Sequence, residues 1–262
     1  MAMARTVNEI LAHADELAAR FESYEPKPLD ELRARLRAAL SAAGDPERAR
    51  AQQAYMKSEM PYYGVSSPEL TVLLRPLLAE FKPANRGVWE ETVRALWDGA
   101  THREERYAAI AYAQHRAAKK WQDPDTLDLY RHLIVTGAWW DLADVVASDL
   151  VGPVLLSYTR KTTPTMREWA VGDDPWLRRA AVLCQLKHGT DTDLDLLSYA
   201  IEANIDDTSF WLRKAIGWAL RQYARTDPEW VRSEVDLLGP RLSGLSRREA
   251  LKHLGDPEWP EG

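Results

Sequence analysis

The sequence predicts an all-α protein, built as a solenoid of antiparallel helix pairs. Ala, Leu, Arg and Glu, which favour helices, are abundant, whereas the alternation of β-branched residues that marks strands is nearly absent. Turn-forming residues interrupt the chain often, leaving helices of about 10 to 16 residues. A related group of residues also returns at a nearly constant interval. Together these three observations favour a helical repeat protein.

Composition narrows the possible classes of protein. The chain has 262 residues, enough for a large core, and no apolar run approaches the ~18 residues of a membrane span. No secretory signal is evident at the N-terminus. Cys184 is the single cysteine, and the six histidines show no ligand spacing, so we expect neither a disulfide nor a metal site. We expect a cytoplasmic protein without a cofactor, and its net charge of −6 argues weakly against a general affinity for polyanions.

Turn signals order the elements along the chain. Residues 1–28 contain a charged helix and a Pro-containing hinge, and we interpret them as an N-terminal appendage to a single repeat domain over residues 29–262. Within that domain, Gly, Pro, Asp and Asn mark the predicted ends of helices. These interruptions lie at residues 44–46, 61, 82–85, 122–124, 162–164, 172–175, 189–191, 206–208 and 226–228.

The repeat can be measured from equivalent positions. If positions 107, 144, 179, 214 and 248 correspond, the intervals are 37, 35, 35 and 34 residues. Such a period, with one helix pair per unit, is typical of a HEAT-like α-solenoid, although it is somewhat short. Stacked pairs form a curved superhelix with one concave face, lined by corresponding positions of each second helix. We therefore expect Asp144, Arg179, Lys214 and Arg248 to line one surface.

The segment Trp139-Trp140-Asp141-Leu142-Ala143-Asp144 combines two indoles with two carboxylates at a predicted helix start. The apolar stripe of this helix would be Trp139, Ala143, Val146 and Leu150. Trp140 and Asp144 then lie roughly 40° apart on a neighbouring face, one turn from each other. An indole beside a carboxylate can hold a cationic or sugar-like group. Alternatively, Trp140 packs on a neighbouring helix and Asp144 is a solvated surface acid.

A second tryptophan lies off the core in the predicted helix over residues 210–223. The core arc of this helix contains Leu212, Ile216, Ala219, Leu220 and Tyr223. Trp218 lies on the opposite arc with Trp211, and Lys214 and Arg221 fall one turn before and after it. This arrangement suits stacking or sugar contact beside cations that bind phosphate. Packing of Trp218 against the next repeat explains it equally well.

Pairs of arginines at predicted helix starts are a further unusual feature. Arg178-Arg179 and Arg247-Arg248 lie where the helix dipole prefers acids. An anionic partner would explain them, and so would a solvated charge pair. Ser246 and Glu249 also have the spacing of a capping box, which makes part of the second motif structural.

Several stretches resemble the DNA alkylation repair family, the AlkD-like DNA glycosylases. They occur in the family's order between about residues 45 and 254. Each is weak alone, but the ordered set is specific. The stretches are Tyr55-Met56-Lys57, Gly64-Val65-Ser66-Ser67-Pro68-Glu69, residues 133–144, Trp176-Leu177-Arg178-Arg179-Ala180-Ala181, Lys214-Ala215-Ile216-Gly217-Trp218 and Leu245-Ser246-Arg247-Arg248-Glu249-Ala250.

The resemblance implies roles for individual residues. Asp144 matches the catalytic carboxylate, and Trp140 and Trp218 match the indoles that contact the deoxyribose of the lesion. Arg179 matches an arginine that holds the DNA backbone, and Tyr55 an aromatic that lines the same cleft. The family is a HEAT-like solenoid that cradles duplex DNA on its concave face. It excises N3- and N7-alkylated purines, and in some members bulky adducts, without extruding the base.

The chemistry suits these residue types. An N3- or N7-alkylpurine is already cationic, so its glycosidic bond breaks without a general acid, and the sugar becomes oxocarbenium-like. One carboxylate can stabilise that sugar and orient water, while indole faces add cation–π stabilisation. We therefore expect a monofunctional glycosylase of base excision repair, without lyase activity, that acts as a monomer on duplex DNA. Lys214, Arg221 and Arg248 are the further candidates for DNA contact.

Two other classes of function stay open. A catalytically inactive HEAT-repeat DNA-binding protein would need the row of bases but not Asp144. A protein-interaction scaffold, a common role of helical solenoids, would bury Trp218 against a partner and show no salt-dependent DNA binding.

Overall fold

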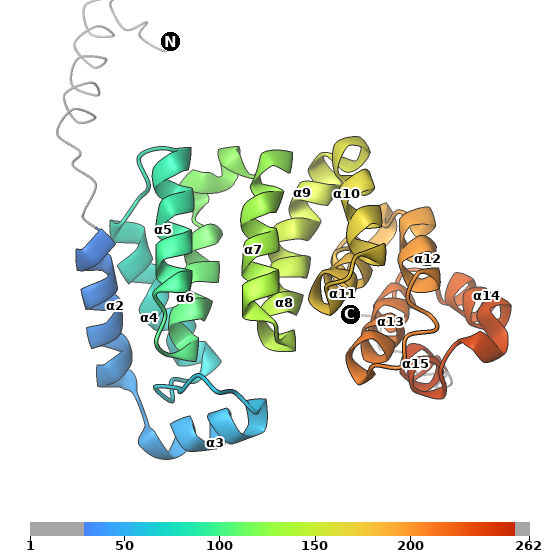
Figure 1. Cartoon of the computed structure of the whole chain (residues 1–262), viewed down its shortest axis with the longest axis horizontal. Helices are drawn as coiled ribbons and strands as arrows, with labels where there is room; N and C mark the ends of the chain where they lie inside the picture. The colour runs from blue at the N-terminus through green and yellow to red at the C-terminus, as the bar shows by residue number, and fades with distance from the viewer. Residues whose placement is uncertain (1–28, 255–262) are drawn as a thin grey trace, which may run out of the picture. The chain divides into compact units, whose positions relative to one another are not determined.

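The computed structural model describes residues 29–254 (Figure 1). Over this range the chain consists of helices, turns and loops, with no strand. This confirms the all-α prediction. The predicted N-terminal appendage, residues 1–28, lies outside the described residues. No helix within residues 29–254 combines the length and the apolar character needed to cross a membrane.

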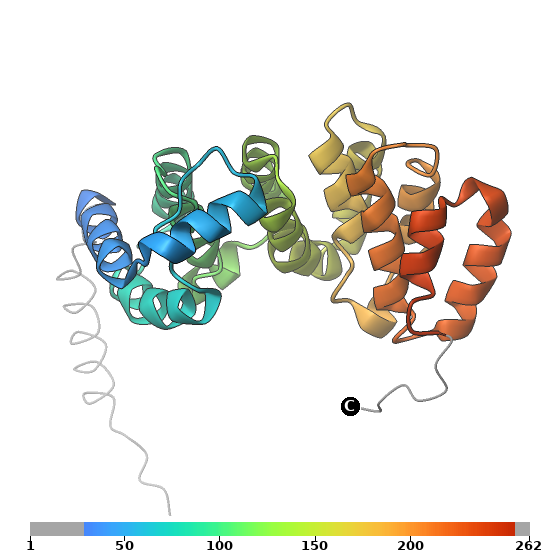
Figure 2. The same cartoon turned by 90° about the horizontal axis from the view of Figure 1, so that it is seen from below.

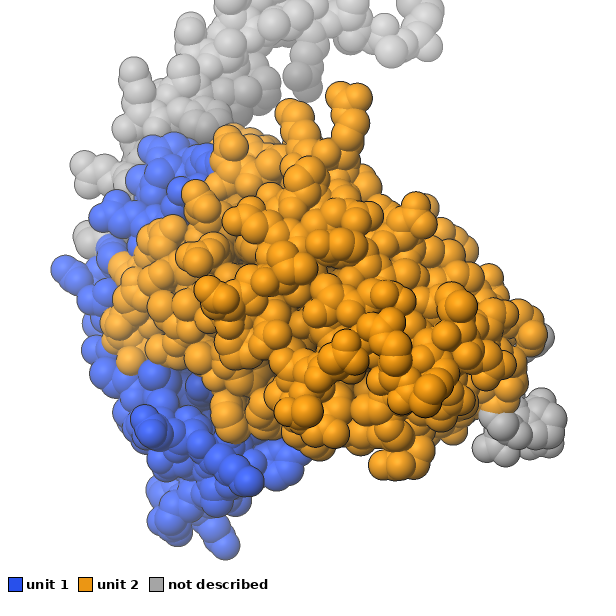
Figure 3. Space-filling model, turned by 45° about the vertical axis from the view of Figure 1, so that its right-hand side comes forward, with its two compact units in different colours: residues 1–92, 101–105 blue, residues 93–100, 106–262 orange. Residues whose placement is uncertain are grey.

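The chain divides into two compact units (Figure 3). The first contains the residues up to 92 together with 101–105, and the second contains 93–100 and the residues from 106 onward. A single repeat domain over residues 29–262 stays a prediction beside this division. The helices of the first unit are α2 (Leu29–Ala43), α3 (Pro46–Met56), α4 (Ser67–Glu80) and parts of α5 (Arg86–Asp98) and α6 (Arg103–Ala113).

In the first unit, α2 follows a regular core pattern and α3 does not. Leu32, Leu36 and Leu40, four residues apart, are fully buried, and α2 packs on α4. Helix α3 buries only Met56, and polar contacts hold it to the loop that follows. Arg48 Nε donates to the Gly64 carbonyl at 2.5 Å, and Gln52 Nε2 donates to the Val65 carbonyl at 3.1 Å.

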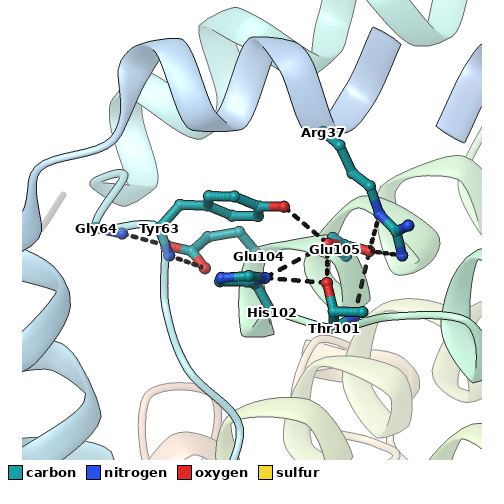
Figure 4. A network of polar contacts seen from close by, with 7 residues as sticks. All are labelled: Arg37, Tyr63, Gly64, Thr101, His102, Glu104 and Glu105. Atoms are coloured by element: carbon teal, nitrogen blue, oxygen red, sulfur yellow. Dashed lines mark hydrogen bonds and ion pairs between the residues drawn. The ribbon is translucent and has the colours of Figure 1, made fainter. Parts of the chain in front are cut away.

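That loop is fixed by a buried carboxylate (Figure 4). Glu104 accepts hydrogen bonds from the backbone N–H groups of Tyr63, Gly64 and Val65, at 3.0, 2.9 and 3.2 Å. Gly64 has a φ of 86°, and a Cβ there would collide with the Asp45 carbonyl, so the turn requires glycine. No local sequence pattern indicates this arrangement, because Glu104 lies about 40 residues from its partners.

Glu105, the next residue, forms a second part of the same network. Arg37 binds its carboxylate through Nε and Nη2 at 3.1 and 3.0 Å, and Thr101 and the Tyr63 hydroxyl also donate to it. Burial alone would raise the pKa of Glu105, but these hydrogen bonds lower it below its ordinary value. His102 stacks on Tyr63 with ring centroids 3.9 Å apart.

The second unit consists of successive helix pairs (Figures 1 and 2). Helices α8, α11, α13 and α15 contact one another in that order, and α10 and α12 are in contact alongside them. Fourteen elements follow α6 along the chain, and their bounds are given next. They are η1 (Arg116–Trp121), η2 (Pro124–Thr126), α7 (Leu127–Gly137), α8 (Trp140–Val145), η3 (Val146–Val151), α9 (Gly152–Ser157), α10 (Thr159–Val171), α11 (Pro175–Leu183), η4 (Gly189–Asp191), α12 (Leu194–Glu202), α13 (Phe210–Tyr223), α14 (Pro228–Leu238), η5 (Gly239–Arg241) and α15 (Gly244–Ala250).

The repeat period recurs as contacts through space. Hydrogen bonds join residues 33 to 36 positions apart in this unit, close to the interval measured along the sequence. They join His188 to the Gly152 carbonyl, Asn204 to the Ala170 carbonyl, Ser198 to Glu234, and Ser246 to the Arg213 carbonyl. Residues one repeat apart are therefore neighbours, as a stacked helical array requires.

One predicted interruption, at residues 162–164, is wrong. Pro164 lies inside α10, which already begins at Thr159. The chain turns earlier, at Tyr158, whose φ of −132° and ψ of 36° end α9. The other predicted interruptions fall between elements or in short turns.

A π-helical turn directly follows the end of α8. In η3, the N–H of Gly152 bonds to the Ala147 carbonyl, five residues back. Pro153 has no N–H to donate, which weakens the ordinary α pattern here. A Cβ on Gly152 would lie 2.5 Å from the Cys184 carbonyl, so glycine lets this helix approach α11 closely. Sequence periodicity alone could not predict the wider turn.

Candidate functional site

Asp144 and Arg179 form a buried ion pair in the second unit. Arg179 Nε lies 2.7 Å from Asp144 Oδ1, and Nη2 lies 2.8 Å from Oδ2, so the pair is bidentate. The residues are only 6% and 3% exposed. Arg179 Nη1 donates in addition to the Trp211 carbonyl. These contacts link α8, α11 and α13 at one point.

This burial corrects one interpretation of Asp144. The helical wheel placed it beside the core stripe, and a solvated surface acid was one alternative. Ala143, Val146 and Leu150 are buried as expected, but the neighbouring face is covered too, because Arg179 on α11 lies against it. A wheel predicts which residues share a face, not how deeply another helix covers it.

Opposing effects act on the acidity of Asp144. Burial raises the pKa of Asp144 above its ordinary value, and the hydrogen bonds and charge of Arg179 oppose that rise. The charge of Asp141 also raises the pKa of Asp144. Asp141 is itself held by the Tyr107 hydroxyl, which donates to its Oδ2 at 2.5 Å. The carboxylate of Asp144 therefore depends on Arg179 for its stabilisation in a low-dielectric setting.

Trp140 and Trp218, the two tryptophans with a role in the family resemblance, both belong to the second unit. Trp140 begins α8, one turn before Asp144, and Trp218 lies in α13; both are half-buried. The side chain of neither residue forms a hydrogen bond, ring contact or cation–π contact with another residue in the range 29–254. Unlike Trp139, Trp176 and Trp211, they therefore pack on no other aromatic ring of the described residues, and part of each side chain reaches solvent.

An aromatic cluster lies at the starts of α8, α11 and α13. The ring centroid of Trp139 lies 6.0 Å from that of Trp176 and 5.2 Å from that of Trp211, and the centroids of Trp176 and Trp211 lie 6.0 Å apart. Phe210, 53% exposed, packs edge-on against Trp211. Trp139, expected in the core, is only half-buried, because it precedes α8 in extended backbone where helical periodicity does not apply.

Sequence reasoning missed this cluster, although a signal was present. Trp139, Trp176 and Trp211 are separated by 37 and 35 residues, close to the repeat period. Trp211 was placed on the arc opposite the core, yet it is half-buried by these rings. Its carbonyl holds Arg179, so the cluster also supports the ion pair with Asp144.

Lys214 and Arg221, two of the predicted DNA contacts, share one buried partner. Both form ion pairs with Glu249 of α15, which is 7% exposed. Burial, followed by the charge of Arg221, lowers the pKa of Lys214. Arg221 likewise has a lowered pKa, through burial and then the charge of Arg225. The sequence pattern does not indicate this shared counter-ion, because Glu249 lies 35 residues from Lys214.

The predicted capping box in α15 is wrong. The helix begins at Gly244, and its N-cap is Ser243, whose hydroxyl accepts from the Ser246 N–H at 3.1 Å. Ser246 is buried within the first turn and donates instead to the Arg213 carbonyl at 2.8 Å. Glu249 is thereby free to turn toward α13.

The remaining candidate residues have different settings. Arg248 is exposed on α15, whereas Arg178 pairs with Asp207 at 3.1 Å and Arg247 donates to the Val235 carbonyl at 3.1 Å. Tyr55 belongs to the first unit and is 77% exposed at the end of α3.

Cys184 is fully buried, and burial raises the pKa of its thiol to about 12. No group of His, Cys, Asp and Glu side chains in the described part of the chain could hold a metal ion.

Comparisons with known proteins agree on one family. Residues 36–254 match the family model described as DNA alkylation repair enzyme. A solved structure from Enterococcus faecalis, described as a predicted DNA alkylation repair enzyme, is similar with a TM-score of 0.73 and 30% sequence identity. That similarity covers 81% of this chain and 97% of the other. No curated protein matched the sequence.

Proposed function

Because the chain belongs to the DNA alkylation repair enzyme family, we propose that it is a monofunctional DNA glycosylase of base excision repair, a hydrolase. Its substrates would be N3- and N7-alkylated purines in duplex DNA. The observation that carries this proposal is the buried carboxylate of Asp144, held at both oxygens by Arg179. The enzyme would act as a cytoplasmic monomer, on the DNA of the nucleoid, and without a cofactor.

Asp144 is the group proposed to act on the sugar. Departure of a cationic alkylpurine leaves an oxocarbenium-like deoxyribose, which a nearby carboxylate stabilises while orienting the attacking water. A preorganised electrostatic contact of this kind contributes about 2.7–4 kcal/mol to the transition state. Such a role needs the ionised form. Arg179 supports that form by opposing the rise in the pKa of Asp144 that burial causes.

Trp140 and Trp218 are proposed to contact the deoxyribose of the lesion. Both side chains are only half-buried, so part of each indole reaches solvent, which supports this role. An indole face stabilises a neighbouring cation through its quadrupole. Extrusion of the base, usual for glycosylases, would need a deep purine pocket, and we propose that this enzyme acts without it.

The DNA contacts are proposals as well. For Arg179 we propose two tasks. Its hydrogen bonds support a role in orienting Asp144, and the family resemblance supports contact with the DNA backbone near the lesion. Lys214, Arg221 and Arg248 would contact phosphates, and Tyr55 would line the DNA cleft. The exposure of Arg248 and Tyr55 is consistent with these roles.

The test is release of 3-methyladenine and 7-methylguanine from alkylated duplex DNA. Wild-type protein should release both free bases, and Asp144→Asn should slow release by about 100-fold or more, the loss expected for one such contact. Asp149→Asn is a matched control five residues away, because Asp149 pairs with Lys187 and lies apart from the Arg179 pair. It should retain wild-type activity. Release by Asp144→Asn at the wild-type rate would exclude the proposed role.

One observation favours a second candidate, a catalytically inactive DNA-binding protein. A buried, fully paired Asp144 could serve only to join α8 to α11. That alternative predicts salt-dependent DNA binding without base release. A protein-interaction scaffold predicts neither salt-dependent DNA binding nor base release.

A further inference from the structure

Glu249 occupies an unusual position between two cations. Lys214 and Arg221 lie one turn before and one turn after Trp218 on α13, and both reach the carboxylate of Glu249 on α15. The side chain of Glu249 is 8% exposed, whereas those of Lys214 and Arg221 are 38% and 24% exposed. The cations therefore reach solvent while their shared counter-ion stays inside the protein.

The contact of α13 with α15 fixes Glu249 at this point. A Cβ added to Gly217 would lie only 2.5 Å from the Cβ of Glu249 and 2.7 Å from the Ser246 carbonyl oxygen. The Ser246 hydroxyl donates to the Arg213 carbonyl at 2.8 Å, which ties the same two helices together. Glu249 is thus built into the contact between α13 and α15, next to Gly217.

The three charges leave one net positive charge. Lys214 and Arg221 supply two positive charges, and Glu249 supplies one negative charge. The outward cations thus offer less attraction for an anion than the sequence indicates. A phosphate that contacts either cation competes with a carboxylate that is buried between α13 and α15.

We propose that Glu249 sets how strongly this part of the protein holds the DNA backbone. It neutralises one cation beside Trp218, so that Lys214 and Arg221 together contribute about one phosphate contact rather than two. This inference rests on the proposed DNA-binding function. Glu249 acts through Lys214 and Arg221 on the affinity for the DNA backbone, and it is not a catalytic residue.

Counterion release makes the proposal measurable. The logarithm of the binding constant falls with the logarithm of salt concentration, with a slope of about −0.9 per phosphate contact. Removing the charge of Glu249 should therefore steepen the slope by about 0.9. Between 50 and 200 mM salt, that difference means an additional loss of affinity of about 3.5-fold.

The experiment measures binding of an unmodified DNA duplex over this salt range for four proteins. Glu249→Gln should have a steeper slope than wild type by about 0.9, and Lys214→Gln a shallower one by about 0.9. The double variant should return to the wild-type slope, because one cation then stands without a counter-ion. Glu234→Gln is the matched control, since Glu234 is also buried and its hydroxyl partner Ser198 carries no charge. Its slope should equal that of wild type.

The outcomes separate this inference from the proposed function. If wild-type protein binds no DNA, both fail. If wild type binds and Glu249→Gln has an unchanged slope, or the double variant keeps the slope of Lys214→Gln, only the role of Glu249 is overturned. Thermal unfolding verifies that each variant is folded at the assay temperature. Should Glu249→Gln fail to fold, Glu249→Ala, which keeps the Cβ packed on Gly217, gives the same test.

Discussion

Replacement of Arg179 by methionine tests the ion pair most directly. Arg179→Met keeps a long side chain in the space beside α8 but removes both hydrogen bonds to Asp144 and the one to the Trp211 carbonyl. Removing one partner of a buried pair costs about 3–5 kcal/mol, because the other charge stays buried without compensation. We expect a loss of that order in the free energy of unfolding at pH 8.

The pH dependence of this loss is specific to the mechanism. Arg179 opposes the effect of burial, so its removal raises the pKa of Asp144 further above the unfolded value of about 3.9. A carboxyl group with a raised pKa in the folded state destabilises the protein as pH rises through that pKa. The loss caused by Arg179→Met should therefore shrink as pH falls from 8 toward 5, where the folded protein takes up the proton.

Urea unfolding at pH 5 and pH 8 measures both effects. The double variant Asp144→Asn/Arg179→Met should lose less stability at pH 8 than Arg179→Met alone, because no charge is then left unpaired. A loss below about 1 kcal/mol that is equal at both pH values would refute the reasoning. It would mean that the Asp144–Arg179 pair is accessible to solvent and not buried.

Two further substitutions test the packing that positions these groups. Gly217→Ala places a Cβ against Glu249 and Ser246 and should lower the unfolding free energy by about 1–3 kcal/mol in thermal unfolding. Gly87→Ala at an exposed position of α5, where an added Cβ would meet only the Asn85 side-chain oxygen at 3.4 Å, should be neutral or stabilising; equal effects at both sites would contradict the close approach of α13 and α15. Glu104→Gln weakens the acceptor of three backbone N–H groups and should cost about 1–3 kcal/mol in urea unfolding. A stability equal to wild type would show that this loop does not depend on the charge of Glu104.

Regular patterns in the sequence predicted the helices and the repeat. The period of 34 to 37 residues returns as contacts between residues 33 to 36 apart, because stacked units place equivalent side chains next to one another. Ala143, Val146 and Leu150 are buried because their helical spacing places them on one stripe. Local features can also be predicted from the sequence. Asp45 caps the start of α3, and its side chain accepts hydrogen bonds from the N–H groups of Glu47 and Arg48, which are close to it in the chain.

The electrostatic environment of the candidate site was harder to predict. The partners of Asp144 and Lys214 are each 35 residues away along the chain, and which charges meet depends on the packing between repeats. The wider turn of η3 depends on Pro153 together with the close approach of Gly152 to Cys184, which no periodicity reveals. The N-cap at Ser243 instead of Ser246 reflects one turn of difference between two plausible helix starts.

The polar contacts between successive helices have a consequence for how this protein can evolve. Solenoids usually tolerate duplication or loss of a unit, because each unit interacts only with its neighbours through similar apolar surfaces. Here Asp144 of α8 depends on Arg179 of α11, Arg179 depends on the carbonyl of Trp211 in α13, and Lys214 of α13 depends on Glu249 of α15. An extra unit inserted between α8 and α11, or between α13 and α15, would leave a buried charge without its partner, and one between α11 and α13 would remove the carbonyl that binds Arg179. From α8 to α15 the array should therefore change by substitution and keep a constant number of units.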